Sequence, residues 1–175
     1  GKPTPVEGKK KVCVVGGGVG CAIALPSAKA FKEAGAEVTV IVGFRNKDIV
    51  ILEDEFKDCA DNLILMTDDG SYGTKGLVTE GVEQIIKREK VDQCVAIGPA
   101  VMMKFVSKLT AQYNIPTVVS LNAIMVDGTV QFANPAHGGA QFEAELEKLM
   151  GIDVEITSDE FNLGLFRAEL NLSLI

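Results

Sequence analysis

An alternation of short β-branched segments with longer helical patterns, beginning at Lys11, constrains the fold more than any other feature. Five segments are almost continuously apolar: VCVV (12–15), VTVIV (38–42), LILMT (63–67), CVAI (94–97) and TVVSL (117–121). Such segments are typical of parallel strands that helices bury on both faces. The alternation predicts an α/β fold with an open parallel sheet of five or more strands and helices on both faces.

The stretches between these strands carry helical spacing. We expect helices around residues 27–34, 49–60, 77–89, 101–113 and 142–150. Pro26 has no amide N–H and suits the first turn of a helix, so the first helix is expected to begin near Pro26. After Leu121 we expect a turn at 127–128 and a strand at 130–132, and the pattern assigns no place to residues 151–175.

Composition limits the classes of function. The 175 residues are 47% hydrophobic and 23% charged, enough for one globular domain with a real core. A net charge of −7 argues against a nucleic-acid partner, which needs clustered basic residues. No apolar run approaches the roughly 20 residues of a membrane span and no signal peptide precedes the first strand, so we expect a cytoplasmic protein without membrane insertion.

The chain offers few residues for acid–base, nucleophilic or metal chemistry. Its four cysteines are widely spaced without a C-x-x-C pair, and we expect them to be small buried hydrophobic residues. The only histidine, His137, lies in a glycine-rich loop, so neither a Ser-His-Asp nor a Cys-His set is available. We therefore expect no catalytic side chain and no metal site, and any redox chemistry would come from bound cofactors.

A glycine-rich segment, GGGVG, directly follows the first strand. An open α/β sheet binds phosphates at this position, between the end of a strand and the start of a helix. The dinucleotide-binding spacing places Cys21 where a third glycine or alanine is usual, and the second strand lacks the acidic residue that binds ribose. Two interpretations stay open: a phosphate-binding loop formed by Gly16, Gly17, Gly18 and Gly20, or a turn that permits tight packing.

Polar or glycine-rich loops follow the other strands, and all should lie at the same carboxyl edge. Arg45 follows the second strand, where it could bind the adenosine ribose or its 2′-phosphate, or could be an ordinary surface residue. Asp68 and Asp69 could hold a metal ion or cap a turn. The fourth strand ends at Gly98-Pro99, and the following Met102 and Met103 could be core residues.

Taken in order, GGGVG, VGFRNKD, TDDGSYGTKG and AIGPAVMM resemble the nucleotide-binding domain of the ferredoxin-NADP reductase superfamily. The most similar branch contains the dihydroorotate dehydrogenase electron-transfer subunit and the small subunit of NADH-dependent ferredoxin:NADP oxidoreductase (sulfide dehydrogenase). The resemblance implies NAD(P) binding, with the pyrophosphate at Gly16, Gly17, Gly18 and Gly20, the adenosine side at Arg45, the cleft lined by Asp69, Gly70 and Ser71, and the nicotinamide near Gly98, Pro99 and Met102.

The resemblance also predicts the domain organisation. Residues 1–10 resemble a linker from an upstream FAD-binding barrel that this sequence does not include, 11–150 form the NAD(P)-binding domain, and 151–175 form an unassigned extension. This branch holds a [2Fe-2S] cluster in a cysteine-rich loop after N-x-I-M-V-D-G-T. Here that loop is lacking and Asn134 stands at the last ligand position, so no cluster is expected.

The resulting hypothesis is a flavin-dependent oxidoreductase domain that binds NAD(P)H and passes its hydride to FAD on an upstream domain. A larger oxidoreductase subunit is a candidate partner. The alternatives are a non-catalytic nucleotide-binding or assembly module, and a flavodoxin-like or receiver-type signalling domain, which the glycine loop fits poorly. The sequence does not choose between NAD and NADP, because the acidic residue is missing and one arginine does not require a phosphate.

Overall fold

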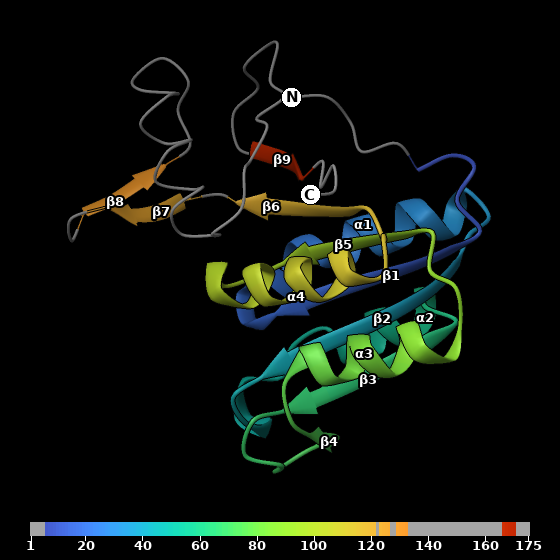
Figure 1. Cartoon of the computed structure of the whole chain (residues 1–175). Coiled ribbons are helices and arrows are strands. Elements are labelled where there is room, and N and C mark those ends of the chain that lie inside the picture. The colour runs from blue at the N-terminus through green and yellow to red at the C-terminus, as the bar shows by residue number, and fades with distance from the viewer. Residues whose placement is uncertain (1–5, 122, 127–128, 133–165, 171–175) are drawn as a thin grey trace.

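The computed structural model describes residues 6–121, 123–126, 129–132 and 166–170. Its main feature is a seven-stranded sheet of order β4-β3-β2-β1-β5-β6-β9 (Figure 1). Six strands are parallel and run Lys11–Gly17 (β1), Glu37–Phe44 (β2), Asn62–Thr67 (β3), Thr74–Lys75 (β4), Gln93–Ile97 (β5) and Thr117–Leu121 (β6). This confirms the predicted open parallel α/β fold and adds the short strand β4, which the sequence pattern did not indicate.

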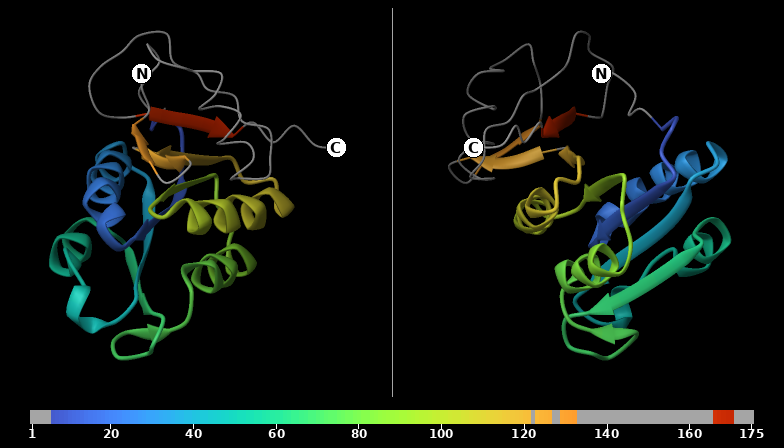
Figure 2. Two further views of the ribbon diagram at one scale, coloured as in Figure 1. Left: turned by 90° about the vertical axis from the view of Figure 1, so that its left-hand side faces the viewer. Right: turned by 45° about the vertical axis from the view of Figure 1, so that its right-hand side comes forward.

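Four helices cover the sheet. Cys21–Glu33 (α1) and Glu53–Cys59 (α2) pack on one face, and Val78–Arg88 (α3) and Ala100–Gln112 (α4) pack on the other (Figures 1 and 2). The side chains of β1 alternate between these layers. Val12 and Val14 join the core under α1 and α2, while Cys13 and Val15 join the core under α3 and α4. Both faces of the central strands are therefore buried, which explains their continuous apolar sequence.

The predicted start of the first helix near Pro26 is wrong. A 3₁₀ turn at Gly18–Gly20 leads directly into α1, which begins at Cys21 and contains Pro26 within its length. Pro26 is exposed, so its ring points away from the core, and it cannot donate the helical hydrogen bond to the carbonyl four residues earlier. The glycine segment is therefore joined to the helix without a long intervening loop.

The predicted helix at 49–60 is divided in the structure. A 3₁₀ turn spans Lys47–Ile49, and α2 begins only at Glu53. Leu52 separates them with a φ of 60°, in the left-handed region that α-helices of L-residues do not continue through. Helices α3 and α4 agree with the predictions at 77–89 and 101–113 to within one residue at each end.

Three strands follow β6 along the chain. Ala123–Val126 (β7) and Thr129–Phe132 (β8) form a separate antiparallel hairpin, and β8 includes the predicted strand at 130–132. Phe166–Leu170 (β9) pairs antiparallel with β6 at the edge of the main sheet, a place that the sequence did not indicate. The predicted helix at 142–150 and His137 lie outside the described residues. Within the described part of the chain, every helix is too short or too polar to cross a membrane.

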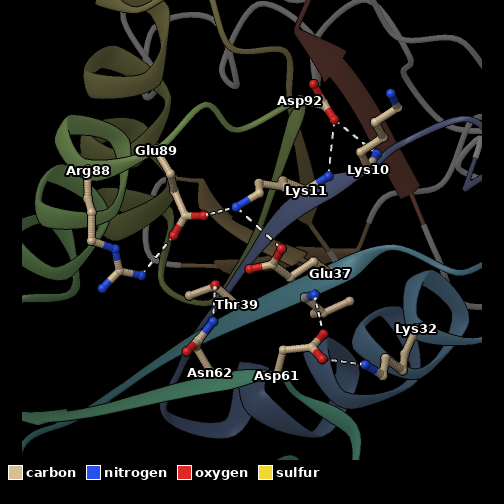
Figure 3. Close-up of polar contacts among 11 residues, drawn as sticks. Lys10, Lys11, Lys32, Glu37, Thr39, Asp61, Asn62, Arg88, Glu89 and Asp92 are labelled. Carbon is tan, nitrogen blue, oxygen red and sulfur yellow. Dashed lines mark hydrogen bonds and ion pairs between the residues drawn. The ribbon is translucent and has the colours of Figure 1, made fainter.

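The amino edge of the sheet is held together by charged groups (Figure 3). The Asp92 carboxylate accepts hydrogen bonds from the backbone amides of Lys10 and Lys11 at 2.9 and 3.0 Å, fixing the start of β1. The Lys11 ammonium pairs with Glu89 at the end of α3 and with Glu37 at the start of β2. These contacts join three segments that are far apart in the sequence.

Asp61 makes a second connection at this edge. Its carboxylate accepts a hydrogen bond from the Val38 amide at 2.8 Å and pairs with the Lys32 ammonium at the end of α1 (Figure 3). Both interactions favour the charged form and hold the pKa of Asp61 below its usual value, with the Lys32 contact as the largest cause. The start of β3 is thereby tied to β2 and to α1.

Candidate functional site

The glycine segment after β1 packs directly against the end of β5. A Cβ atom built on Gly20 would overlap the carbonyl oxygen of Ile97 and would lie 2.7 Å from the Cα of Gly98. Both of these atoms belong to the backbone, so neither can move aside by changing rotamer. Glycine at position 20 is therefore required by packing, whether or not a ligand binds nearby.

Gly17, Gly98 and Met102 meet at the centre of this junction. A Cβ on Gly17 would lie 2.5 Å from the Met102 sulfur and 3.0 Å from the Pro99 Cδ, and a Cβ on Gly98 would lie 3.0 Å from the Gly17 Cα. The structure thus brings together the segment that the sequence analysis assigned to the pyrophosphate and the segment that it assigned to the nicotinamide. Met102 is partly buried and Met103 is fully buried, so Met102 packs over the junction while Met103 belongs to the core.

Gly16 makes room for Cys21 beneath the loop. A Cβ on Gly16 would lie 2.9 Å from the Cys21 sulfur, and burial raises the pKa of this thiol to about 12. Cys21 is therefore a neutral packing residue at neutral pH. Cys13, Cys59 and Cys94 are also buried free thiols, which confirms the prediction that the four cysteines are small core residues.

Gly18 differs from the other glycines of the segment. Its φ is +53°, and a Cβ built on it would have no atom within 4 Å. No side chain among the described residues caps the 3₁₀ turn or the first turn of α1, and the same holds for the first turn of α4. Backbone N–H groups at such helix starts carry partial positive charge, so this corner of the sheet can accept an anion.

A second group of predicted residues lies at the ends of β2 and β3. The amides of Asp68 and Asp69 donate to the carbonyl oxygens of Phe44 and Arg45 at 3.0 and 3.3 Å, continuing the pairing of the two strands into their loops. Arg45 is exposed and forms no ion pair within the described residues. Its guanidinium is available to a phosphate or ribose.

Asp69 organises the loop after β3. Its carboxylate accepts hydrogen bonds from the Ser71 hydroxyl at 2.6 Å and the Ser71 amide at 2.9 Å, and these two bonds hold the pKa of Asp69 below its usual value. Gly70 between them has a φ of +76°. The sequence left two roles open for Asp68 and Asp69, a metal site or a turn cap, and these contacts of Asp69 are those of a turn cap. Among the described residues, no three acidic, cysteine or histidine side chains are grouped so that they could hold a metal ion.

The predicted site residues thus form two groups along one edge. The first contains Gly16, Gly17, Gly18, Gly20, Gly98, Pro99 and Met102, and the second contains Arg45, Asp69, Gly70 and Ser71. The pairing of Gly17 with Gly43 on adjacent strands β1 and β2 connects them. Their assignment to a bound nucleotide stays a prediction.

Two residues of this edge were missed by the sequence analysis. The Lys47 ammonium lies 5.4 Å from the centre of the Tyr72 ring, and the Tyr72 hydroxyl donates to the Glu53 carboxylate at 3.1 Å. Both lie inside the quoted segments VGFRNKD and TDDGSYGTKG. The resemblance therefore already included both residues, although only the fold shows that the two segments are in contact.

No protein-family model matches the chain. The dihydroorotate dehydrogenase B (NAD(+)) electron transfer subunit homolog of Thermotoga maritima is 48% identical over 129 residues, covering 74% of this chain and 45% of the relative. The probable electron transfer subunit of the same enzyme from Methanocaldococcus jannaschii is 39% identical over 118 residues, covering 67% and 46%. The chain spans less than half the length of these two relatives.

Solved structures show the same fold. The structure of the NADH-dependent reduced ferredoxin-NADP oxidoreductase superposes with a TM-score of 0.64 at 37% identity, covering 86% of this chain and 64% of the other. The C-terminal domain of PF1911 hydrogenase from Pyrococcus furiosus superposes with a TM-score of 0.57 at 24% identity, covering 68% and 96%. The second likeness concerns the fold alone.

The sheet order, the helix layers and these neighbours define a ferredoxin-reductase-like domain. Within that class, the relatives of this chain are electron transfer subunits of dihydroorotate dehydrogenase B and the NADH-dependent ferredoxin-NADP oxidoreductase. This confirms the resemblance that the four sequence segments indicate. The relatives are parts of oxidoreductases, so the chain is related to redox proteins.

Proposed function

We propose that this domain binds NAD(P)H along the carboxyl edge of its sheet and passes the hydride to FAD held by an upstream FAD-binding domain. The observation that carries the proposal is the junction of the glycine segment with the end of β5. There the space beside Gly17 and Gly20 is filled by neighbouring atoms. Gly18 faces open space, and the nearby helix starts have no side-chain cap. A pyrophosphate is expected to bind at this corner because close backbone approach and helix N-termini without side-chain caps coincide there.

The two groups of residues would bind the two ends of the dinucleotide. Arg45 would interact with the adenosine side, where its exposed guanidinium can reach a ribose or a phosphate. Gly98 and Pro99 would border the nicotinamide, with Met102 keeping the Gly17–Gly98 junction closed beneath it. The nicotinamide supplies the hydride, and the chain supplies position, so the lack of a catalytic acid or base is compatible with this role.

The proposal includes electron transfer without an iron-sulfur cluster in this domain. All four cysteines of the sequence are buried at positions 13, 21, 59 and 94, none of them in the segment where the related branch places its cluster ligands. A [2Fe-2S] cluster needs about four such ligands. The purified protein should contain neither iron nor acid-labile sulfide, and stoichiometric amounts of both would contradict this part.

Nucleotide titration tests the proposal directly. NADH and NADPH are titrated into the chain by calorimetry, with Arg45→Ala as the test variant and Arg88→Ala as the matched control. Arg88 is an exposed arginine at the opposite edge that pairs with Glu89. We expect Arg45→Ala to weaken the binding of at least one nucleotide about tenfold, corresponding to one lost charge-assisted contact. Arg88→Ala should leave nucleotide binding unchanged.

Three outcomes discriminate between the hypotheses. If the wild-type chain binds neither nucleotide, the proposal fails. If a longer protein that includes the upstream segment binds nucleotide but purifies without flavin, the non-catalytic module is favoured. Flavin in the longer protein, together with its reduction by the bound nucleotide, supports the oxidoreductase function and the role of a partner domain.

A further inference from the structure

The loop that carries Arg45 is fixed from both sides by the loop after β3. The carbonyl oxygen of Arg45 accepts a hydrogen bond from the Asp69 amide at 3.3 Å, and the Lys47 amide donates to the Ser71 hydroxyl oxygen at 2.8 Å. The Asp68 amide also donates to the Phe44 carbonyl oxygen at 3.0 Å, so the loop after β3 holds the backbone both before Arg45, at Phe44, and after it, at the Arg45 carbonyl and at Lys47. The position of the guanidinium therefore depends on the neighbouring loop.

The only proton of the Ser71 hydroxyl is used in this contact. The hydroxyl donates it to the Asp69 carboxylate at 2.6 Å, while its oxygen accepts from Lys47. The lowered pKa of Asp69 agrees with a carboxylate that stays ionised as the acceptor of two Ser71 donors. Ser71 consequently has no proton left to donate to a ribose hydroxyl or a phosphate oxygen.

The loop after β3 is itself attached to the body of the domain. The Thr67 hydroxyl donates to the Tyr72 carbonyl oxygen at 2.6 Å, and the Tyr72 hydroxyl donates to Glu53 on α2 at 3.1 Å. Glu53 also pairs with Lys57 at 2.8 Å. The support for Arg45 thus continues from β3 and α2 through Tyr72 to Ser71, and these contacts anchor the loop to both elements.

We propose that Ser71 and Asp69 are positioning residues that act through Arg45, rather than lining residues that contact the nucleotide. This inference depends on the proposed function, because it assigns the mechanism of adenosine-side recognition at the same edge. It replaces the role that the family resemblance implies for Asp69 and Ser71. Arg45 then contacts the ligand, and the two polar residues fix the backbone from which it reaches out.

A double-mutant cycle with ADP-ribose, which is NAD without its nicotinamide, tests the inference. Ser71→Ala removes the hydroxyl that the Lys47 amide and the Asp69 carboxylate share and keeps the backbone amide bond to Asp69. We expect it to weaken ADP-ribose binding about fivefold to tenfold, as for one lost hydrogen bond. Ser71→Thr keeps the hydroxyl and should bind within about twofold of wild type. In the Arg45→Ala background, Ser71→Ala should cause almost no further loss, because its effect passes through the missing side chain.

Asp61→Ala is the matched control for Asp69→Ala. Both carboxylates accept a backbone amide hydrogen bond beside β3, but Asp61 lies at the amino edge. Asp61→Ala should lower the melting temperature while leaving ADP-ribose affinity unchanged, whereas Asp69→Ala should weaken ADP-ribose binding.

The possible failures are distinct. If wild type binds ADP-ribose and NADH but the losses from Arg45→Ala and Ser71→Ala are additive, Ser71 contacts the ligand itself and the positioning role is overturned. Unchanged affinity in Ser71→Ala overturns it as well. If wild type binds no nucleotide at all, the proposed function fails first and this inference fails with it.

Discussion

The two edges of the parallel sheet are built in opposite ways. At the amino edge, carboxylates and ammonium groups are matched with each other and with backbone amides, as in the contacts of Asp92, Asp61 and Lys11. At the carboxyl edge, the side chains of Met102 and Pro99 pack against Gly17, and the backbone of Ile97 and Gly98 packs against Gly20. Arg45 and the helix starts there have no charged partner within the described residues.

This difference separates stability from binding. A charged group that is already paired contributes to the folded state and has little left to offer a ligand, whereas an unpaired guanidinium or helix start can bind an anion. The amino edge is therefore expected to respond to mutation through stability alone. The carboxyl edge should also respond through affinity, and the following substitutions test that division.

The largest effect is expected for Gly20→Ala. The new methyl group would overlap backbone atoms of Ile97 and Gly98, which cannot move without separating β5 from the glycine segment. Forced overpacking of this kind should lower the free energy of unfolding by roughly 3 kcal/mol. Urea denaturation followed by circular dichroism measures the change, and a loss near zero would show that the junction is looser than the structure indicates.

Gly18→Ala is the matched substitution two residues earlier. Its methyl group meets no atom within 4 Å, so the expected cost is only the strain of a left-handed backbone at φ +53°, about 1 kcal/mol. Its NADH affinity should fall more than its stability suggests, because the methyl group occupies the space proposed for the pyrophosphate. Equal NADH affinity in wild type and Gly18→Ala would place the pyrophosphate elsewhere.

At the amino edge, Asp92→Ala should have a smaller effect than Gly20→Ala. The substitution removes one acceptor from the amides of Lys10 and Lys11, which water can partly replace because both lie near the surface. We expect a loss of about 1 kcal/mol in the free energy of unfolding. Nucleotide affinity should stay unchanged, and a fall in affinity would break the division between the two edges.

The same carboxylates predict how stability depends on pH. Hydrogen bonds from the amides of Lys11 and Lys10 lower the pKa of Asp92, and Lys11 and Arg88 lower that of Glu89. Because the folded protein binds these protons less readily than the unfolded chain, the stabilisation is complete above the unfolded pKa values of about 4 and is lost as pH falls below them. The melting temperature of wild type should therefore drop between pH 5 and pH 3, and more steeply than that of Asp92→Asn.

The fold could be predicted from the sequence because its strands are apolar on both faces. Each segment such as VCVV or CVAI has no plausible place other than the middle of a covered sheet. The exact starts of two helices were harder to predict. Pro26 within α1 and the left-handed Leu52 before α2 contradict their own local preferences, so tertiary packing decided both helix starts.

The site was predictable only in part for a related reason. Sequence shows which residues follow each strand, and the order of strands determines which loops meet. It does not show that a side chain at Gly17 would collide with Met102 and one at Gly20 with Ile97, whereas a side chain at Gly18 would meet no neighbouring atom. That distinction depends on atomic packing across β1 and β5. The same holds for the contact of Ser71 with Lys47, which joins residues 24 positions apart.

The smallest effect is expected for Glu37→Gln. Glu37 and the Lys11 ammonium it pairs with at 3.3 Å are both about 40% exposed, so water screens the attraction and competes for both groups. In this variant Lys11 also keeps its ion pair with Glu89, whose side chain is only 16% exposed. The melting temperature should therefore change by less than about 1 °C. Differential scanning calorimetry at low and high salt measures it, and a salt-sensitive loss of several degrees would show that this exposed ion pair contributes as strongly as the backbone contacts of Asp92.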